Sequence, residues 1–330
     1  MNATRTRVQR RPVHGVLLLD KPLGLSSNDA LQKVKWLLRA EKAGHTGTLD
    51  PLATGVLPLC FGAATKFSQL QLEAPKTYIA VARLGQTTTT ADAEGEVLQE
   101  RPVDLAGMTP AVLAQVQARF TGPIQQVPPM YSALKKDGKA LYEYARAGIE
   151  IERPARDVTI HALDIVLCKD ADGWDALQLT VTCSKGTYIR TLAEDVGEAL
   201  GCGAHLRSLR RTDTGGIGVD RCITLDALIA MPEEERMSVV QPADCLLHAH
   251  TRVTLDASES GRFLTGLRRR GEWPDAEAVA VYGDEPRALL GVGHITSGEL
   301  IPDRLLSPLE IQQILEGTPR PQDRGILETV

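Results

Sequence analysis

Long apolar runs are absent from this sequence of 330 residues. No stretch approaches the roughly 20 apolar residues that a membrane-spanning helix needs, so we expect no contact with a membrane. The first residues carry arginines but lack the apolar core of a secretory signal. These features predict a cytoplasmic protein, with a length that fits one large domain and a smaller one.

Cysteines are few and scattered. Six occur, without a Cys-x-x-Cys pair and without a cluster of cysteine and histidine at zinc-binding spacing. Cys168 and Cys183 fall in apolar, strand-like runs and are predicted to be small core residues. We therefore expect reduced cysteines and no structural metal.

An excess of positive charge is also missing, because the formal net charge is −5. This balance argues against bulk attraction to nucleic acid, so any RNA binding would need local basic patches. For each patch taken alone, a solvated surface is the simpler explanation. The candidates are Arg5, Arg7, Arg10 and Arg11; Lys135, Lys136 and Lys139; Arg207, Arg210 and Arg211; and Arg268, Arg269 and Arg270.

The hydrophobic pattern predicts an α+β fold. Ser26 or Ser27 can cap a helix that follows an apolar strand at 15–19. Polar and apolar residues alternate over 78–84 and 176–184, and the second of these strands runs into a helix that Gly201 closes. Because strands and helices mix without regular βαβ alternation, we expect a largely antiparallel sheet.

Composition changes twice along the chain. Residues 124–155 hold three of the six tyrosines, and 131–156 carry six basic and four acidic side chains, which predicts a lobe inserted into the main domain. After about residue 250, strands at 278–283 and 287–292 around a helix at 257–269 predict a small β-rich domain. We expect a flexible basic arm at 1–14, a main domain at 15–250, the β-rich domain at 251–317 and a loose tail at 318–330.

One loop carries the most informative residues. In Gly44-His-Thr-Gly-Thr-Leu-Asp50-Pro-Leu-Ala-Thr-Gly55, a single carboxylate stands among glycines that allow a ligand to approach the backbone closely. No second carboxylate is near, as the paired layout of glycosidases would require. The residues alone leave two interpretations open: a nucleophilic aspartate, or an Asx turn before proline.

Four long segments resemble the TruB-type tRNA pseudouridine synthases. GHTGTLDPLATGVLPLCFGAATK is similar to their catalytic motif and GVLLLDKPLGLSSNDAL to their N-terminal motif. PPMYSALKKDGKALYEYARAG resembles their RNA-gripping insertion, and CSKGTYIRTLAEDVGEALGCGAHLRSLRRT their second active-site block. The motifs follow the family's order over nearly the whole chain. The resemblance implies a pseudouridine-synthase catalytic domain with a mixed, largely antiparallel sheet, followed by an RNA-binding domain of the PUA type.

The same resemblance implies an activity. Uridine 55 in the T arm of tRNA would be flipped out of its stack and isomerised to pseudouridine. The reaction would need no cofactor or metal, no guide RNA and no obligate protein partner, and we expect a monomer. Two alternatives stay open: an RNA-binding or tRNA-folding protein without catalysis, and a guide-RNA-dependent relative like those of archaeal and eukaryotic complexes.

Six residues match positions of the family's site. By resemblance, Asp50 is the nucleophile and Arg190 the cation that keeps it ionised although a base packs over it. Tyr78 lies against the target base, where it can stack and help to move the C5 proton. Tyr188 and Leu209 line the uracil pocket, and His45 fills the gap that the flipped base leaves. Without the resemblance, each has a plainer interpretation as a core, loop or surface residue.

Overall fold

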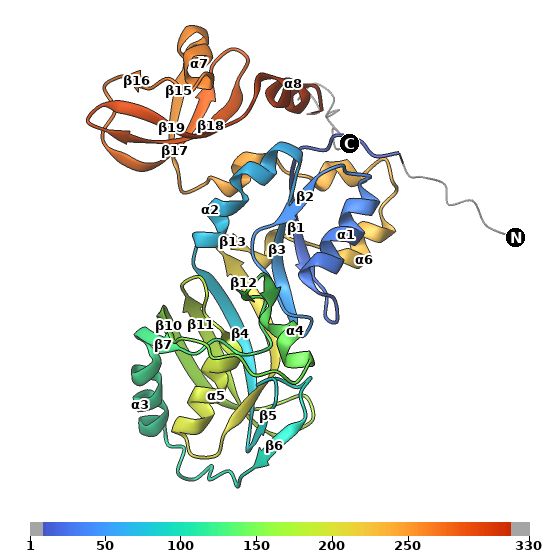
Figure 1. Ribbon diagram of the computed structural model, residues 1–330, viewed down its shortest axis with the longest axis vertical. Helices are drawn as coiled ribbons and strands as arrows, with labels where there is room; N and C mark the ends of the chain where they lie inside the picture. The colour runs from blue at the N-terminus through green and yellow to red at the C-terminus, as the bar shows by residue number, and fades with distance from the viewer. Residues whose placement is uncertain (1–8, 318–330) are drawn as a thin grey trace, which may run out of the picture.

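Two β-sheets of unequal size organise residues 9–317, the part of the chain that the computed structural model describes (Figure 1). The larger sheet has ten strands, in the order β14-β1-β3-β12-β4-β11-β10-β7, with β13 beside β12 and β2 beside β3. Its strands are β1 (Gly15–Lys21), β2 (Ala43–His45), β3 (Ala53–Phe61), β4 (Lys76–Leu84), β7 (Gly122–Gln126), β10 (Arg156–Lys169), β11 (Asp175–Cys183), β12 (Ala204–Thr214), β13 (Ile217–Gly218) and β14 (Ile223–Thr224).

The smaller sheet lies at one end of the elongated molecule, with two helices of its own, α7 (Ala257–Leu264) and α8 (Pro308–Gly317) (Figure 1). Its order is β15-β17-β18-β19-β16. The strands are β15 (Thr251–Leu255), β16 (Arg269–Arg270), β17 (Ala276–Gly283), β18 (Ala288–Thr296) and β19 (Glu299–Leu305). Two separate hairpins pair β5 (Gln86–Thr88) with β6 (Val97–Glu100), and β8 (Lys135–Lys136) with β9 (Lys139–Ala140).

Most strand pairs in the larger sheet are antiparallel, whereas β1 with β14 and β3 with β12 are parallel. The predicted α+β class with a mixed, largely antiparallel sheet and a small β-rich C-terminal part is therefore confirmed. The helices beside this sheet are α1 (Ser27–Leu37), α2 (Ser68–Glu73), α3 (Pro110–Phe120), α4 (Leu141–Arg146), α5 (Ile189–Ala199) and α6 (Leu225–Ala230), with short 3₁₀ turns η1 (Gly62–Phe67), η2 (Val219–Arg221), η3 (Arg236–Val239) and η4 (Ala243–Leu246).

Local sequence signals account for the elements around the centre of the sheet. Ser26 caps α1, because its side chain accepts a hydrogen bond from the Asp29 amide. In β11 the apolar residues of the predicted alternation are buried and the polar ones lie outward. Helix α5 packs its apolar stripe on β12 and ends before Gly201, whose φ of +85° suits glycine.

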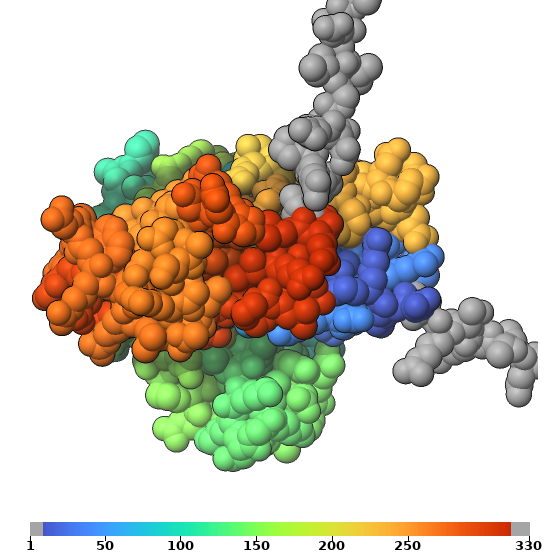
Figure 2. All heavy atoms as spheres, turned by 90° about the horizontal axis from the view of Figure 1, so that it is seen from above, coloured from blue at the N-terminus to red at the C-terminus, as the bar shows by residue number. Residues whose placement is uncertain are grey.

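The two sheets are joined by a shared apolar core, not by a flexible linker. Phe67, at the end of η1, and Val16 of β1 belong to one buried cluster with Tyr282 of β17 and Leu306. Polar contacts border this core: Lys66 pairs with Glu310 of α8 at 2.6 Å. In Figure 2 the red spheres of α8 border the blue spheres of the N-terminal part of the chain. Burial of apolar surface on both sides therefore fixes the orientation of the smaller sheet.

Two sequence expectations need correction. The helix predicted at 257–269 ends at Leu264, because Gly266 adopts a φ of +86° and the chain then enters β16. Cys168, near the end of β10, is only partly buried, whereas Cys183 is a core residue. The predicted tail at 318–330 and residues 1–8 of the predicted arm lie outside the described residues, while Arg11 pairs with the backbone of Arg39 at 2.8 Å.

The six cysteines, all within the described range, form no disulfide with one another. None of the helices in that range is long and apolar enough to cross a bilayer.

Two helical glycines provide a test of how tightly α5 is packed. A Cβ at Gly197 would lie 2.3 Å from the backbone nitrogen of Ala204 in β12, whereas a Cβ at Gly261 of α7 meets nothing within 4 Å. We expect Gly197→Ala to lower the free energy of unfolding by about 1–3 kcal/mol through overpacking. Gly261→Ala should leave it unchanged or raise it by up to about 1 kcal/mol. Urea unfolding of both variants measures this, and equal effects would contradict the close helix–sheet packing.

Candidate active site

A cavity of about 650 Å³ opens where β4 and β12 meet the start of α5 and the loop between β2 and β3. Of the six residues predicted for the site, five line this cavity: Asp50, Tyr78, Tyr188, Arg190 and Leu209. His45 is outside the lining but lies two positions before Gly47, which belongs to it. Residues separated by more than 150 positions in sequence are thus brought together by the fold.

The loop that carries Asp50 is fixed on both sides. The buried Ser27 hydroxyl accepts from the Leu49 amide at 2.7 Å and donates to the Leu49 carbonyl at 3.0 Å, which ties the loop to the first turn of α1. On the other side, the Gly24 amide donates to the Pro51 carbonyl at 2.9 Å. This support holds Asp50 in a defined position, with its side chain 40% exposed toward the cavity.

Arg190 is the centre of the polar contacts. Its side chain is only 5% exposed, and Nη2 lies 2.9 Å from Oδ2 of Asp50. The same Nη2 donates to the Tyr131 carbonyl at 2.7 Å, and Nη1 donates to the Thr90 carbonyl at 3.2 Å. Arg190 is the second residue of α5, whose N-cap Tyr188 is extended. A buried guanidinium held by fixed acceptors on several sides presents its charge to Asp50 without needing to rearrange.

Asp92 is a second carboxylate at this arginine, and sequence analysis assigned it no role. It is buried, and its Oδ2 lies 3.6 Å from Nη1 of Arg190. Thr90 and the Glu94 amide donate to its other oxygen at 2.5 and 3.0 Å. Asp92 therefore shares Arg190 with Asp50. The polar segment at 87–95 contains it, but the sequence does not show that this segment folds back onto α5.

Three of the predicted site residues belong to the apolar part of the cavity wall. Tyr78 of β4 lies opposite Val181 of β11, and Leu209 of β12 is paired with both Ala80 and Ala53. Both side chains are about nine-tenths buried. Tyr188 is positioned through its backbone, since its amide donates to the side-chain oxygen of Gln126 at 3.0 Å and its carbonyl accepts from the same amide group. Gln126 is a supporting residue that sequence analysis missed.

His45 ends β2, opposite Leu59 of β3. Burial and, secondly, the charge of Arg211 lower the pKa of His45, so its ring is neutral at pH 7. Its Nδ1 is buried without a hydrogen-bond partner among the described residues. A neutral ring with a free nitrogen can stack on bases, but it is not a cation for phosphates.

Three buried basic side chains lie at or near the cavity, and two of them, Lys76 and Arg211, belong to its wall. Burial lowers the pKa of Lys21 and of Lys76 to about 8 in each case. Lys21 donates to the Pro22 and Leu25 carbonyls, and Lys76 closes α2 by donating to three carbonyls of its last turn. Arg211 is 1% exposed.

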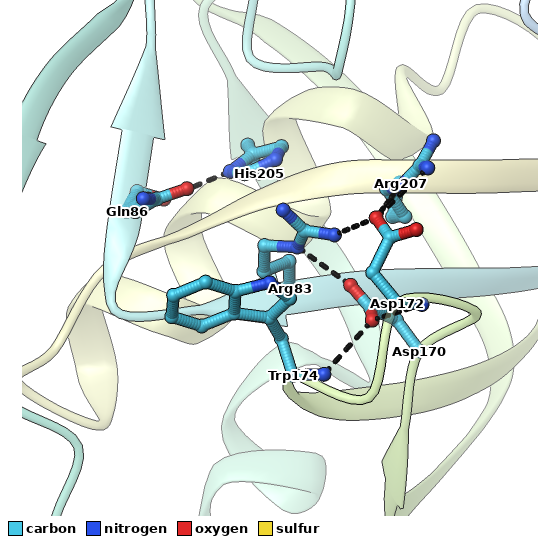
Figure 3. A network of polar contacts seen from close by, with 7 residues as sticks. All are labelled: Arg83, Gln86, Asp170, Asp172, Trp174, His205 and Arg207. Carbon is cyan, nitrogen blue, oxygen red and sulfur yellow. Dashed lines mark hydrogen bonds and ion pairs between the residues drawn. The ribbon is translucent and has the colours of Figure 1, made fainter.

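The candidate basic patch of Arg207, Arg210 and Arg211 therefore does not form. Arg211 is buried, Arg210 pairs with Asp20 at 2.7 Å, and Arg207 belongs to a network around Asp172. Figure 3 shows this network, in which Arg83 reaches both Asp170 and Asp172. It fastens the turn between β10 and β11 onto β4 and β12. The alternating strand places neighbouring arginines on opposite faces, so no continuous patch results.

The predicted insertion remains a basic surface. Its hairpin β8–β9 presents Lys135, Lys136 and Lys139 to solvent, and α4 follows. Lys139 lies over the Tyr144 ring at 4.9 Å. Figure 2 shows the green part of the chain, which includes this segment, projecting from the body. Exposed cations interleaved with tyrosines suit phosphates and unstacked bases.

The site offers no ready metal position. Within residues 9–317 there is no group of three His, Cys, Asp or Glu side chains that could hold an ion. The arrangement provides the accessible carboxylate of Asp50 beside the fixed guanidinium of Arg190, and an apolar pocket with the Tyr78 phenol. These groups can support nucleophilic attack and proton transfer on a flat, uncharged ring.

Comparison with known proteins agrees with this geometry. Residues 35–189 match the model of the TruB family pseudouridylate synthase N-terminal domain, and 190–248 and 251–306 match two TruB C-terminal models. A tRNA pseudouridine synthase B from Verminephrobacter eiseniae is 70% identical over 99% of this chain and 98% of its own length. The chain belongs to the TruB family. Another such synthase, from Cupriavidus pinatubonensis, is 60% identical over 91% of this TruB-family chain and 96% of its own.

Solved structures show the same fold. A chain in a crystal structure of a Cbf5-Nop10-Gar1 complex shares 26% identity with this TruB-family chain at a TM-score of 0.65, over 90% of this chain and 87% of its own length. A chain in an H/ACA RNP bound to a substrate RNA containing 2'-deoxyuridine reaches the same TM-score at 24% identity, covering 93% and 92% of the two chains. The predicted family and fold are thus confirmed.

Lys21 generates a pH prediction. Its pKa is about 8 in the folded protein, below the ordinary value of 10.5. Between pH 8 and 10.5 the unfolded chain therefore binds more protons at Lys21 than the folded protein does. As a result, the free energy of unfolding rises as pH increases through this window. We expect the stability of the wild type relative to Lys21→Met to rise by on the order of 1 kcal/mol from pH 8 to 10.5. Urea unfolding at several pH values measures it. The exposed Lys33→Met is the control, and a flat difference for both variants would rule out the burial effect.

Proposed function

We propose that this chain isomerises uridine 55 in the T loop of tRNAs to pseudouridine, with Asp50 as the nucleophile and without a cofactor. Membership of the TruB family and the name of the 70% identical relative support the reaction and the class of RNA. The observation that carries the assignment to this site is the 2.9 Å ion pair between Arg190 and Asp50 at the wall of a cavity large enough for a nucleotide base.

The proposed reaction breaks the bond between uracil N1 and ribose C1′, turns the base, and joins its C5 to C1′. The Asp50 carboxylate can attack C1′, attack C6 of the base, or assist elimination to a glycal. Each route needs an ionised and accessible carboxylate. Arg190 supplies the charge that keeps Asp50 ionised when a base covers it, and Asp92 orients Arg190 from the other side.

The remaining residues bind the flipped nucleotide. Tyr78 stacks on the uracil, and Tyr188 and Leu209 border its edge. Extrusion of a base from a folded T loop costs a few kcal/mol of lost stacking. His45 offsets part of this cost by restacking in the gap, a role that fits its neutral ring.

The division of the chain follows the same proposal. Residues 15–250 form the catalytic domain, their segment at about 124–155 grips the T arm, and 251–317 form a PUA-like RNA-binding domain. The basic arm at 1–14 and the tail at 318–330 stand outside these units. We infer a cytoplasmic monomer that acts without a guide RNA or an obligate protein partner, although the structural relatives include a Cbf5-Nop10-Gar1 complex. Activity of the purified chain on naked tRNA tests this independence.

Asp50→Asn provides the direct test of the nucleophile. A transcript of tRNA labelled with tritium at uracil C5 releases the label when pseudouridine forms. We expect release by the wild type and a loss of at least about 1,000-fold in Asp50→Asn, because an amide is no nucleophile here. The exposed Asp164→Asn on β10 is the matched control and should retain full activity. Equal release by wild type and Asp50→Asn would remove Asp50 from the mechanism.

The insertion's lysines generate a second test. Replacing Lys135, Lys136 and Lys139 by alanine removes up to three phosphate contacts, so tRNA binding should weaken and the slope of log Kd against log salt should fall by up to about 2 to 3. The matched control replaces Lys33, Lys35 and Lys42, which lie away from the cavity. If both triple variants show the wild-type slope, the cluster is an ordinary solvated surface.

A further inference from the structure

Arg211 is the bulkiest fully buried side chain in the described part of the protein. Its Nε donates to the Val56 carbonyl at 2.7 Å, and Nη2 lies 3.5 Å from the Gly47 carbonyl. Within residues 9–317 it forms no ion pair, in contrast to Arg190 and Arg210. Burying a guanidinium without a carboxylate partner costs several kcal/mol, which an ordinary core side chain would avoid.

The surroundings make this burial more costly. The charge of Arg211 acts, after burial, to lower the pKa of both Lys76 and Lys21, and it also lowers that of His45. Arg211 therefore lies close enough to both buried lysines to repel them. A neutral donor could satisfy the Val56 carbonyl equally well, so the hydrogen bond alone does not explain an arginine.

The sheet places Arg211 directly beside Tyr78. The two residues are partners across the antiparallel pair of β12 and β4, so their side chains leave the same face of the sheet. Both line the cavity. Burial raises the pKa of the Tyr78 phenol, and Arg211 opposes this by its charge and by hydrogen bonding. The other groups that face the phenol, Cys183 of β11 and Asp50, act in the direction of burial.

We propose that Arg211 is a positioning residue for Tyr78: it holds the phenol oxygen over the base and stabilises its deprotonated form, so that Tyr78 accepts the C5 proton of the product precursor. The inference rests on the proposed function and deepens it. Arginine suits this task because Nε is anchored on Val56 while the guanidinium keeps further donors besides the long 3.5 Å contact of Nη2 with Gly47, and because its charge is permanent.

The step balances as a proton transfer. Once C5 is joined to C1′, C5 still carries its hydrogen. The phenolate oxygen takes this proton and becomes a phenol, and the electron pair of the C–H bond forms the C5–C6 double bond. The pair displaced at C6 moves onto N1, which takes a proton from water, or onto the departing Asp50 carboxylate if that group was bound to C6. The phenol then returns its proton to solvent.

The test combines two substitutions at Arg211 with a change at Tyr78. Arg211→Gln keeps a donor but removes the charge, and Arg211→Lys keeps the charge. Each is made in the wild type and in Tyr78→Phe, and the single-turnover rate of pseudouridine formation is measured with saturating tRNA from about pH 6 to 10. Urea midpoints and tRNA affinity report on folding and binding.

We expect Arg211→Gln to slow the wild-type reaction by at least about 10-fold and to move the rising limb of the pH profile to higher pH, with Arg211→Lys closer to the wild type. In Tyr78→Phe, the same substitutions should add little, because the group they act on is gone. If Arg211→Gln does not fold, the effect of Arg211→Lys in the two Tyr78 backgrounds decides the question.

Equal slowing in both backgrounds, or an unshifted pH profile in the presence of Tyr78, would show that Arg211 is only structural and overturn the inference. The proposed function would survive that result, since the wild type still makes pseudouridine. Failure of the wild type to form pseudouridine would overturn both, and it is detected in the first measurement of the series.

Discussion

The contact between Arg190 and Asp50 is the constraint on which the rest of the site depends. A lone carboxylate under an apolar ring tends to be neutralised, and a guanidinium at 2.9 Å opposes this. The two residues are 140 positions apart and belong to different elements, so the fold has to fix both. Ser27 clamps the loop of Asp50 to α1, and the packing of α5 on β12 fixes Arg190.

Buried cations surround the cavity, and their positions suit the proposed chemistry. Lys21, Arg190 and Arg211 are buried around the cavity, whereas Asp50 and Asp92 are the carboxylates that meet Arg190. Breaking the N1–C1′ bond leaves the negative charge of that bond on the uracil ring. Fixed cations in a water-poor pocket stabilise such a charge more effectively than solvent does, because they are already oriented when it develops. Burying these cations lowers the stability of the folded protein, but the same cations stabilise the negative charge that develops during the proposed reaction.

Sequence analysis predicted what is encoded locally or in long motifs. The cap at Ser26, the alternation of β11 and the apolar stripe of α5 follow from periodicity, and the six site residues followed from resemblance rather than from spacing. What it missed depends on long-range register. From the sequence, Arg211 was a candidate for a surface patch, but its register opposite Tyr78 places it in the interior. Asp92 pairs with Arg190 only because its loop folds back onto α5. No local pattern contains these neighbours.

The insertion contributes to the candidate active site as well as to the proposed surface for RNA. Arg190 donates through Nη2 both to Asp50 and to the carbonyl of Tyr131, which belongs to the insertion. Displacing the insertion would therefore remove one fixed acceptor from the buried guanidinium of Arg190. Because an unsatisfied buried donor is costly, the guanidinium would turn toward another acceptor, and its contact with Asp50 would become less well defined. An RNA that engages the lysines of β8 and β9 acts on the same segment. A single hydrogen bond thus connects RNA binding at the insertion with the orientation of the proposed nucleophile. A substrate too short to reach the insertion would lose this orienting effect as well as binding energy.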